Sequence, residues 1–329
     1  MDEMLNGAVG GCATGCVNFH KVAVVGCGMV GSTIAFSLME SGLFAELVMI
    51  DVDHRRAEGE AMDISHGVPF AHPMKICAGD YAAIGDAGLV IVAAGANQQP
   101  GESRLDLIDK NIQIFRQIIP EIAKPTFRGI LLVVSNPVDI LTQVALQLSG
   151  LPEHRVIGSG TVLDTARLKY AVGDYLQVDS RSVHAFVIGE HGDSEIVAWS
   201  CANVSGIALT EFCRLRGRQN YENAIEKLAE EVRTSAYQII SRKRATYYGI
   251  ACSVRRICEA IVRNERSILS ISSMIDGEYG IERTVLSMPT IVGMGGIEAR
   301  APLKLSEQEL QALQGSARQL QEIFAKQQL

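Results

Sequence analysis

The sequence lacks three features, and each lack excludes a class of protein. It has no run of about 18 apolar residues, the length that a helix needs to cross a bilayer. It has no long run of basic residues and its net charge is −7, so nucleic acid is not an expected partner. Its first 19 residues lack the basic start and the longer apolar segment of a secretion signal. We therefore expect a cytoplasmic protein that binds neither a membrane nor nucleic acid.

Cysteines are scattered and form no framework. There are eight, and Cys12 and Cys16 are spaced as C-x3-C. No second pair of Cys or His lies near enough in sequence to complete a zinc site. We interpret the cysteines as reduced thiols and expect no metal. Apolar residues, by contrast, make up 47% of the 329 residues, which is enough for one large domain or two medium ones.

The first functional motif joins a strand to a helix. Lys21–Val25 is a short apolar run typical of a buried parallel strand. It leads into Gly26-Cys-Gly-Met-Val-Gly31 and then a helical pattern, which together form a dinucleotide-binding fingerprint. We expect Gly26 to permit the turn, Gly28 to let a pyrophosphate approach, and Gly31 to let strand and helix pack closely. The free N–H groups of the helix N-terminus would then face the phosphates.

A carboxylate follows at the position that this fingerprint requires. A second strand, Leu47–Ile50, ends in Asp51, 20 residues past Gly31. Such a carboxylate accepts hydrogen bonds from ribose hydroxyls and repels a 2′-phosphate, so NAD is the expected cofactor rather than NADP. An Asp that only caps the next helix is the alternative. Asp51 lies at the spacing from the glycine motif that a dinucleotide site requires, which favours cofactor binding over this alternative.

Strands and helices alternate through the first half of the chain, which predicts an α/β fold. We expect a Rossmann-type doubly wound parallel sheet, followed by an α+β substrate domain. We place an N-terminal extension at 1–19, an NAD-binding domain at 20–160 and a substrate domain at 161–329. Further strands are predicted at Gly88–Ala94, Ile130–Val134 and Val156–Gly160, the last of which closes the sheet, and a third βα unit begins at Asp80-Tyr81. Helices are predicted at Arg55–Ser65, Leu105–Ile122 and Tyr221–Arg242. Ser306 with Glu309 predicts a capping box at the start of a further helix.

Two polar stretches follow predicted strands. Ala96–Arg104 contains Pro100 and Gly101, so it is predicted to be a mobile lid. From the residues alone, its Gln98 and Arg104 are either ligand-binding groups or parts of a solvated loop. Asn136 precedes a proline, which favours an extended backbone, and it either donates to a ligand carbonyl or only forms a turn.

The second half contains a histidine between two glycines. His191 lies in Gly189-Glu-His-Gly-Asp-Ser-Glu195, just after a predicted strand at His184–Ile188. Histidine titrates near neutrality and therefore suits a group that gives and takes one proton. Asp164 and Arg167 lie three residues apart at the start of a predicted helix, so they could simply form an ion pair. Alternatively, Asp164 fixes the tautomer of His191 and Arg167 offers its planar fork to a substrate carboxylate.

Taken in order, five motifs resemble those of the lactate/malate dehydrogenase family, and in particular those of its bacterial L-lactate dehydrogenases. The resemblance covers nearly all of residues 20–327. It implies an NAD-dependent enzyme that transfers hydride reversibly between NADH and pyruvate to give L-lactate. The motifs are Gly26–Gly31, Gln98-Gln-Pro-Gly-Glu-Ser-Arg104, Ser135-Asn-Pro-Val-Asp139, Leu163-Asp-Thr-Ala-Arg167 and Gly189-Glu-His-Gly-Asp193.

The resemblance also implies a role for each site residue. His191 would protonate the carbonyl as hydride arrives, Asp164 would orient it, and Arg167 would bind the carboxylate. Arg104 would polarise the carbonyl, and a neutral Gln98 would disfavour oxaloacetate, because malate dehydrogenases carry Arg at that position. Asn136 would orient the carbonyl and Thr246 would line the methyl side of the substrate. Near the cofactor the family places Gly26, Gly28, Met29, Val30, Gly31, Asp51, Arg56, Tyr81, Gly95, Ala96, Val134, Asn136 and Ser159.

Several alternatives stay open at this point. Within the family, a dehydrogenase for bulkier 2-oxo acids, or less favourably for malate, is the second interpretation. Outside it, a non-catalytic dinucleotide-binding protein would need a broken catalytic set, and a zinc enzyme built on His184 and His191 lacks further ligands. Bacterial relatives activated by fructose 1,6-bisphosphate use an Arg and a His at a subunit interface, where this chain has Lys169 and His184. Arg244 stands where many relatives have Gly, and the family's dimers and tetramers predict a homo-oligomer.

Overall fold

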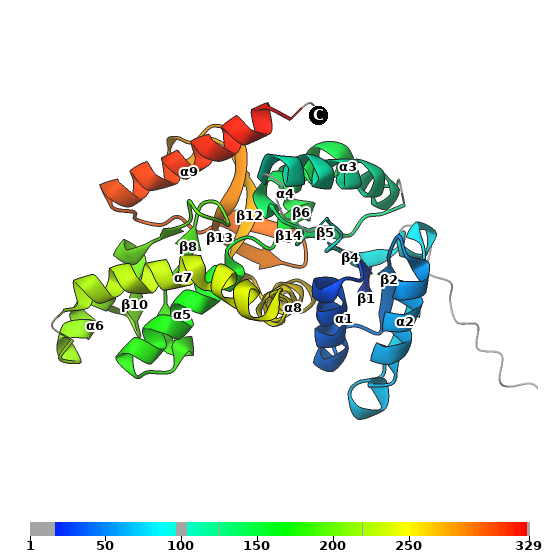
Figure 1. Cartoon of the computed structure of the whole chain (residues 1–329), viewed down its shortest axis with the longest axis horizontal. Helices are drawn as coiled ribbons and strands as arrows, with labels where there is room; N and C mark the ends of the chain where they lie inside the picture. Colours follow the sequence, from blue (N-terminus) through cyan, green and yellow to red (C-terminus); the bar gives the residue numbers. More distant parts are fainter. Residues whose placement is uncertain (1–16, 97–103, 125, 219, 328–329) are drawn as a thin grey trace, which may run out of the picture.

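The computed structural model describes residues 17–96, 104–124, 126–218 and 220–327 (Figure 1). Its main feature is one nine-stranded sheet with the order β14-β13-β12-β6-β5-β4-β1-β2-β3. Six strands are parallel and lie in the order 3-2-1-4-5-6, so the predicted Rossmann-type sheet is confirmed. These strands are β1 (Asn18–Val25), β2 (Glu46–Ile50), β3 (Lys75–Ala78), β4 (Ala87–Val92), β5 (Ile130–Val133) and β6 (Val156–Gly158).

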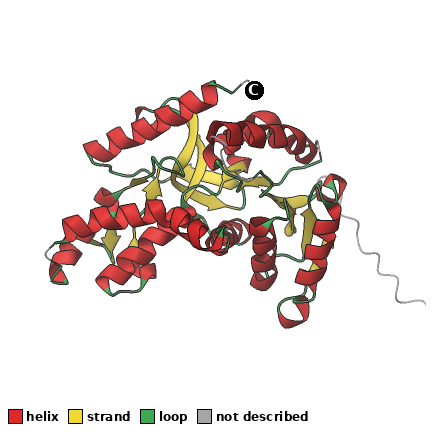
Figure 2. Ribbon diagram, viewed as in Figure 1, coloured by secondary structure: helices red, strands yellow, loops and turns green. Residues whose placement is uncertain are grey.

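Helices cover both faces of the sheet (Figure 2). On one face α3 (Arg104–Ile122), α4 (Val138–Ser149) and α9 (Glu307–Ala325) bury apolar side chains such as Phe115 and Leu313. On the other face α1 (Met29–Ser41), α2 (His54–Ser65) and α8 (Tyr248–Val262) bury a second set that includes Ile34 and Ile257. The predicted capping box at Ser306 and Glu309 starts α9. Two apolar faces covered in this way make every central strand fully buried.

The prediction that Val156–Gly160 closes the sheet is wrong. β12 (Ser267–Ile275) pairs antiparallel with β6 through Ser272 and Gly158, and β13 (Thr284–Gly293) and β14 (Gly296–Arg300) continue the sheet. A Cβ on Gly158 would lie 2.7 Å from the Cβ of Ser272, so a glycine is needed for the two strands to meet. The second half of the chain thus contributes three strands to the sheet of the first half.

Two further local predictions are corrected. β3 had not been predicted, and Asp80-Tyr81 does not begin a βα unit: the Asp80 side chain accepts the Ala82 N–H and caps a short 3-10 helix at Tyr81–Ile84. The strand expected at His184–Ile188 is broken. β7 (Val183–His184) pairs with β10 (Asn203–Val204), whereas β8 (Val187–Ile188) pairs with β9 (Ile196–Val197), so the chain passes from one small sheet to another between them.

The remaining elements form a smaller lobe beside the sheet (Figure 1). A third buried cluster, which includes Leu168 and Val232, holds α5 and α7 together. The elements of this lobe are α5 (Val162–Leu176), α6 (Leu209–Leu215), α7 (Tyr221–Lys243) and β11 (Ile207–Ala208), together with β7 and β10. Among the described residues, no helix has both the length and the apolar character needed to span a bilayer.

Candidate active site

The glycine motif forms a turn that could cradle a phosphate. Gly26 has a φ of 98°, and a Cβ there would lie 2.5 Å from the backbone of Ala94, so only glycine fits. A Cβ on Gly31 would overlap the carbonyl oxygen of Gly26, which explains the close packing of α1 on β1. A Cβ on Gly28 would meet nothing within 4 Å, and no side chain caps α1 at this residue. The turn therefore presents open space and the N-terminus of a 13-residue helix to a ligand.

Asp51 lies beside this turn at the end of β2. Its Oδ2 accepts the N–H of Cys27 at 2.7 Å, and its Oδ1 accepts the N–H of Asp53 at 2.9 Å. Each carboxylate oxygen keeps a second lone pair for a ribose hydroxyl. The side chain of Asp53, not Asp51, caps α2 through the N–H of Arg56, so the alternative that Asp51 is only a helix cap is wrong. The donors and the open space fit a dinucleotide such as NAD.

The other predicted cofactor residues follow strand ends at the same edge of the sheet. The structure places all of them at or after the C-terminal ends of the parallel strands, where doubly wound sheets bind ligands. Met29 and Val30 begin α1; Arg56 lies on α2; Tyr81 follows β3; Gly95 and Ala96 follow β4; Val134 and Asn136 follow β5; Ser159 follows β6.

A buried asparagine that had no predicted role joins two of these strand ends. Asn111 on α3 is 1% exposed. Its Oδ1 accepts the N–H of Ala96 at 2.7 Å, and its Nδ2 donates to the carbonyl of Asn136 at 2.8 Å. Asn111 thus fixes the ends of β4 and β5 relative to each other. A polar residue within the apolar stripe of a helix was the signal that could have identified it.

The segment that carries His191 is held from several sides. Gly189, with a φ of 87°, exchanges two backbone hydrogen bonds of 2.9 Å with Ser287 on β13. The Glu190 N–H donates to the Ser316 hydroxyl of α9 at 2.9 Å, and the His191 N–H donates to Asp139 on α4 at 2.7 Å. From α7, the Tyr237 hydroxyl donates to Asp193 at 2.9 Å. His191 therefore has a fixed backbone, which is a requirement for a residue that must meet a substrate.

Asp164 binds both of its predicted partners at once. Its Oδ2 lies 2.6 Å from Nδ1 of His191, and its Oδ1 accepts from the Arg167 guanidinium at 2.7 Å. The sequence left an ion pair with Arg167 and a bond to His191 as alternatives, and the structure contains both. Asp164 is 2% exposed, whereas the side chains of Arg167 and His191 are 15% and 24% exposed. A buried carboxylate thus orients two groups that face a ligand.

The charges around this pair tune its protonation. Burial alone would lower the pKa of His191, but the charge and hydrogen bond of Asp164, and the charges of Asp139 and Glu195, raise it to about 9. Burial would raise the pKa of Asp164, but His191 and Arg167 outweigh it and hold that pKa below its usual value. Near neutral pH the pair is an imidazolium beside a carboxylate. Such a pair can give a proton to a developing oxyanion.

Sequence reasoning assigned no function to two buried acids next to His191. Asp139, at the start of α4, accepts from the His191 N–H and from the Ser272 hydroxyl, and burial raises its pKa to about 6. Glu195 is 6% exposed and lies close to both Asp164 and His191. Both residues stand within motifs quoted above. Asp139 meets partners that are distant in sequence, and Glu195 meets Asp164 only in the folded chain, so no local sequence pattern indicates either role.

The remaining predicted residues are placed less completely. Gln98 and the predicted lid at 97–103 lie outside the described residues, and Arg104 is the first residue of α3. Thr246 is half-buried between α7 and α8. Lys169 is half-buried on α5 and His184 is exposed on β7, an element that packs against α5.

Arg244 ends α7 in a left-handed conformation, with a φ of 70°. Its N–H donates to the carbonyl of Ile240 at 2.7 Å. A glycine adopts this conformation without strain, whereas a residue with a Cβ does not.

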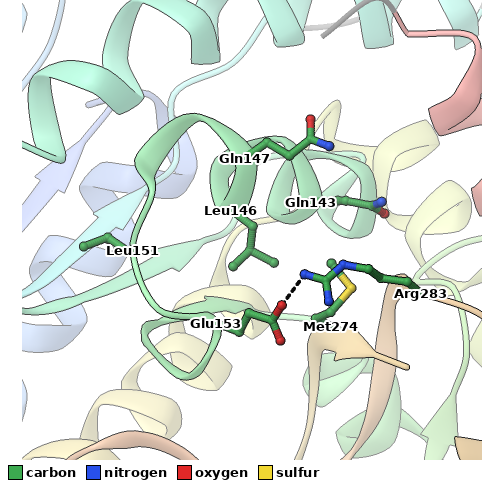
Figure 3. Close-up of a pocket in the computed structure, with 7 residues that line it drawn as sticks. All are labelled: Gln143, Leu146, Gln147, Leu151, Glu153, Met274 and Arg283. Carbon is green, nitrogen blue, oxygen red and sulfur yellow. Dashed lines mark hydrogen bonds and ion pairs between the residues drawn. The ribbon is translucent and has the colours of Figure 1, made fainter. Parts of the chain in front are cut away.

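A pocket lined by residues of α4, of the segment before β6 and of the β12–β13 region is separate from this site (Figure 3). Its volume is about 330 Å³, and its lining residues, which include Gln143, Leu146 and Met274, contain none of the predicted site residues. Glu153 precedes β6 and pairs with Arg283 across the pocket. Arg283, the cationic residue among those that line the pocket, is thus already paired, so we place the chemistry at His191 instead.

Comparisons with known proteins agree with the geometry. Family models match for the NAD binding domain of lactate/malate dehydrogenase at residues 20–158 and for its alpha/beta C-terminal domain at residues 161–328. An L-lactate dehydrogenase of Acetivibrio thermocellus is 50% identical over 304 residues, 92% of this chain and 96% of the relative. One from Priestia megaterium is 50% identical over 298 residues, 91% of this chain and 93% of the relative.

Solved structures give the same picture. A lactate dehydrogenase from a deep-sea metagenome library of the Medee basin has a TM-score of 0.90 and 46% identity, covering 93% of this chain and 98% of that one. The minor L-lactate dehydrogenase of Enterococcus mundtii has a TM-score of 0.91 and 42% identity, covering 96% of this chain and 99% of that one.

Proposed function

This chain belongs to the lactate/malate dehydrogenase family, and from that premise we propose that it is an NAD-dependent L-lactate dehydrogenase that uses His191 as its acid and base. One observation carries the proposal: Asp164 binds His191 and Arg167 together, so a proton donor and a carboxylate receptor stand side by side. All three residues come after β6 in the chain, and the parallel sheet before them has the features of an NAD site. NADH bound at that sheet would supply the hydride.

The chain's own residues then divide the remaining work. Arg167 binds the carboxylate of pyruvate with its planar fork and orients the keto carbon. Cationic His191 donates its proton to the carbonyl oxygen, and the neutral imidazole takes it back when L-lactate is oxidised. Asp164 keeps the ring in the required tautomer and stabilises the cation. Arg104 polarises the carbonyl, Asn136 orients it and Thr246 lines the side of the methyl group.

Gln98 decides which oxo acid the site accepts. Oxaloacetate carries a second carboxylate, and a neutral amide leaves that charge unpaired in a closed site, a penalty on the order of 3 kcal/mol. Pyruvate has only a methyl group there. We therefore propose pyruvate over oxaloacetate, and over bulkier acids such as 2-oxoisocaproate.

NADH oxidation with these three acids tests the proposal. The expected order of kcat/KM places pyruvate first, and Gln98→Arg should move the preference toward oxaloacetate. His191→Asn should lower kcat/KM for pyruvate by about 10²–10⁴-fold. His54→Asn is the matched control, because His54 is exposed and its Nδ1 lies 3.3 Å from Glu58, on α2. A His191→Asn variant as fast as wild type would refute the role of His191, and faster turnover of oxaloacetate than of pyruvate would refute the substrate.

Regulation and assembly are further parts of the proposal. Burial lowers the pKa of Lys169, so a nearby phosphate would stabilise its charged form. We propose that Lys169 and the exposed His184 bind fructose 1,6-bisphosphate between subunits of a cytoplasmic homo-oligomer, a dimer or a tetramer. Pyruvate titrations with and without the bisphosphate test this, and identical curves would contradict it.

A further inference from the structure

Glu195 is a buried carboxyl group for which the reaction above has no use. It is 6% exposed, and its Oε1 has no hydrogen-bond partner among the described residues. One oxygen of Glu195, one of Asp164 and a ring nitrogen of His191 lie within 4.8 Å of one another. A buried polar atom without a partner destabilises the fold. Its position directly beside the acid–base pair points to a role in the site.

Three such groups could hold a metal ion or a proton, and the surroundings favour the proton. Both oxygens of Asp164 are already engaged, by His191 and by Arg167. Two guanidinium groups act on the cluster, Arg167 from α5 and Arg233 from α7. A divalent cation would have to displace the bonds of Asp164 and approach both arginines. A proton on Glu195 requires neither change.

The charges that face Glu195 give the same answer. Burial and the charge of Asp164 favour its neutral form and raise its pKa to about 8, although the cations His191, Arg233 and Arg167 oppose this. Arg233 also pairs with Glu230 at 2.7 Å, so its charge is partly balanced elsewhere. Near neutral pH Glu195 is therefore protonated while His191 is cationic.

We propose that Glu195 is a positioning residue that keeps its proton so that the site can accept a second anion. This inference rests on the proposed function. With Glu195 neutral, the charges of Asp164 and Asp139 offset cationic His191, and the guanidinium of Arg167, paired on one side with Asp164, still offers donors to the substrate carboxylate. Ionised Glu195 adds an unbalanced negative charge to a buried site and repels that carboxylate. Productive binding of pyruvate therefore requires two protons in the site, one on His191 and one on Glu195.

The test is the alkaline limb of the pH profile for pyruvate reduction, with wild type and Glu195→Gln. In wild type, log(kcat/KM) should fall with a limiting slope of about −2, because both protons are lost. In Glu195→Gln only the proton of His191 can be lost, so the slope should be about −1. Binding of oxamate, an unreactive analogue of pyruvate, to the enzyme–NADH complex should show the same two slopes without turnover.

Two further variants keep the outcome interpretable. Glu190→Gln makes the same change in the same segment, but the Glu190 carboxylate accepts from Ser194 at 2.5 Å, so it should keep the wild-type slope. Glu195→Asp retains a carboxyl group and should also retain a slope near −2, even if Glu195→Gln fails to fold. A wild-type slope of −1, or a slope of −2 in Glu195→Gln, overturns the inference. So does inhibition by Zn²⁺ that Glu195→Gln abolishes. Wild-type enzyme that does not reduce pyruvate would instead overturn the proposed function.

Discussion

The carboxylate of Asp139 holds the backbone of His191 through a hydrogen bond of 2.7 Å that spans 52 residues of sequence. Its other oxygen accepts from the Ser272 hydroxyl on β12 at 2.5 Å. Asp139 is 2% exposed, so both bonds are shielded from water. One acid at the start of α4 thus connects the end of the parallel sheet, the antiparallel extension and the acid–base residue.

This bond predicts a difference between two substitutions of Asp139. Asp139→Ala leaves the buried His191 N–H unsatisfied and should lower the free energy of unfolding by about 2–3 kcal/mol, with a fall in kcat/KM. Asp139→Asn keeps an acceptor for that N–H, and the Ser272 hydroxyl can rotate to accept from the amide. The free energy of unfolding of Asp139→Asn should therefore fall by less than about 1 kcal/mol. Urea unfolding of both variants measures this. Equal losses would show that the bond does not anchor His191.

Asp164→Asn should shift the pH dependence of catalysis. The charge and hydrogen bond of Asp164 are the main reasons that His191 has a pKa of about 9, so without them the alkaline limb should move toward pH 6.5. The loss of kcat/KM should therefore be larger at pH 8.5 than at pH 6. Arg167→Lys is the comparison: it keeps a cation beside Asp164 but loses the fork, so KM for pyruvate should rise while the limb stays in place. An unmoved limb in Asp164→Asn would contradict the assignment.

The sequence predicted the parallel sheet because its signals are local. Each buried strand is a continuous apolar run, and the glycine turn lies between a strand and a helix within one short segment. β7 and β8 were predicted as a single strand because each is only two residues long and their partners, β10 and β9, are distant contacts. The antiparallel extension beyond β6 was missed for the same reason: nothing in Val156–Gly158 indicates that Ser272 will pair with it.

The candidate site shows the same division. His191 was identified from its flanking glycines, and Asp164 and Arg167 from their spacing on a helix. Spacing alone could not decide between their two pairings, because Asp164 has two oxygens and the fold uses both. Glu195 was not assigned a function, because its role depends on charges brought from α5 and α7, which only the folded chain places together.

Stability should decrease as the pH rises from about 6 to 9. In the folded chain the pKa of His191 is raised from 6.5 to about 9, and that of Glu195 from 4.5 to about 8, so the folded state binds more protons than the unfolded state. The stabilisation from His191 is complete below pH 6.5 and is lost as the pH rises through 9. Its size is on the order of 2 kcal/mol, since the side chain is partly exposed.

Thermal unfolding at a series of pH values measures this dependence. Tm should fall over that range in wild type, and the part of the fall between pH 6.5 and 9 should be smaller in His191→Asn. His54→Asn should behave as wild type, because His54 is exposed on α2. A Tm that rises over the same interval would show that the folded state does not hold these protons more tightly.

Arg244→Gly should make the protein more stable. Arg244 follows the last turn of α7 with a φ of 70°, a conformation that is strained for a residue with a Cβ and favourable for glycine. Removing that strain should raise the free energy of unfolding by about 0.5–1 kcal/mol, less the entropy that glycine adds to the unfolded chain. The matched control is Arg242→Gly, two residues earlier, where the backbone is helical and glycine should cost up to about 1 kcal/mol. Urea unfolding of the two variants should therefore give changes of opposite sign. A destabilised Arg244→Gly would mean that contacts of the arginine side chain outweigh the strain of its backbone.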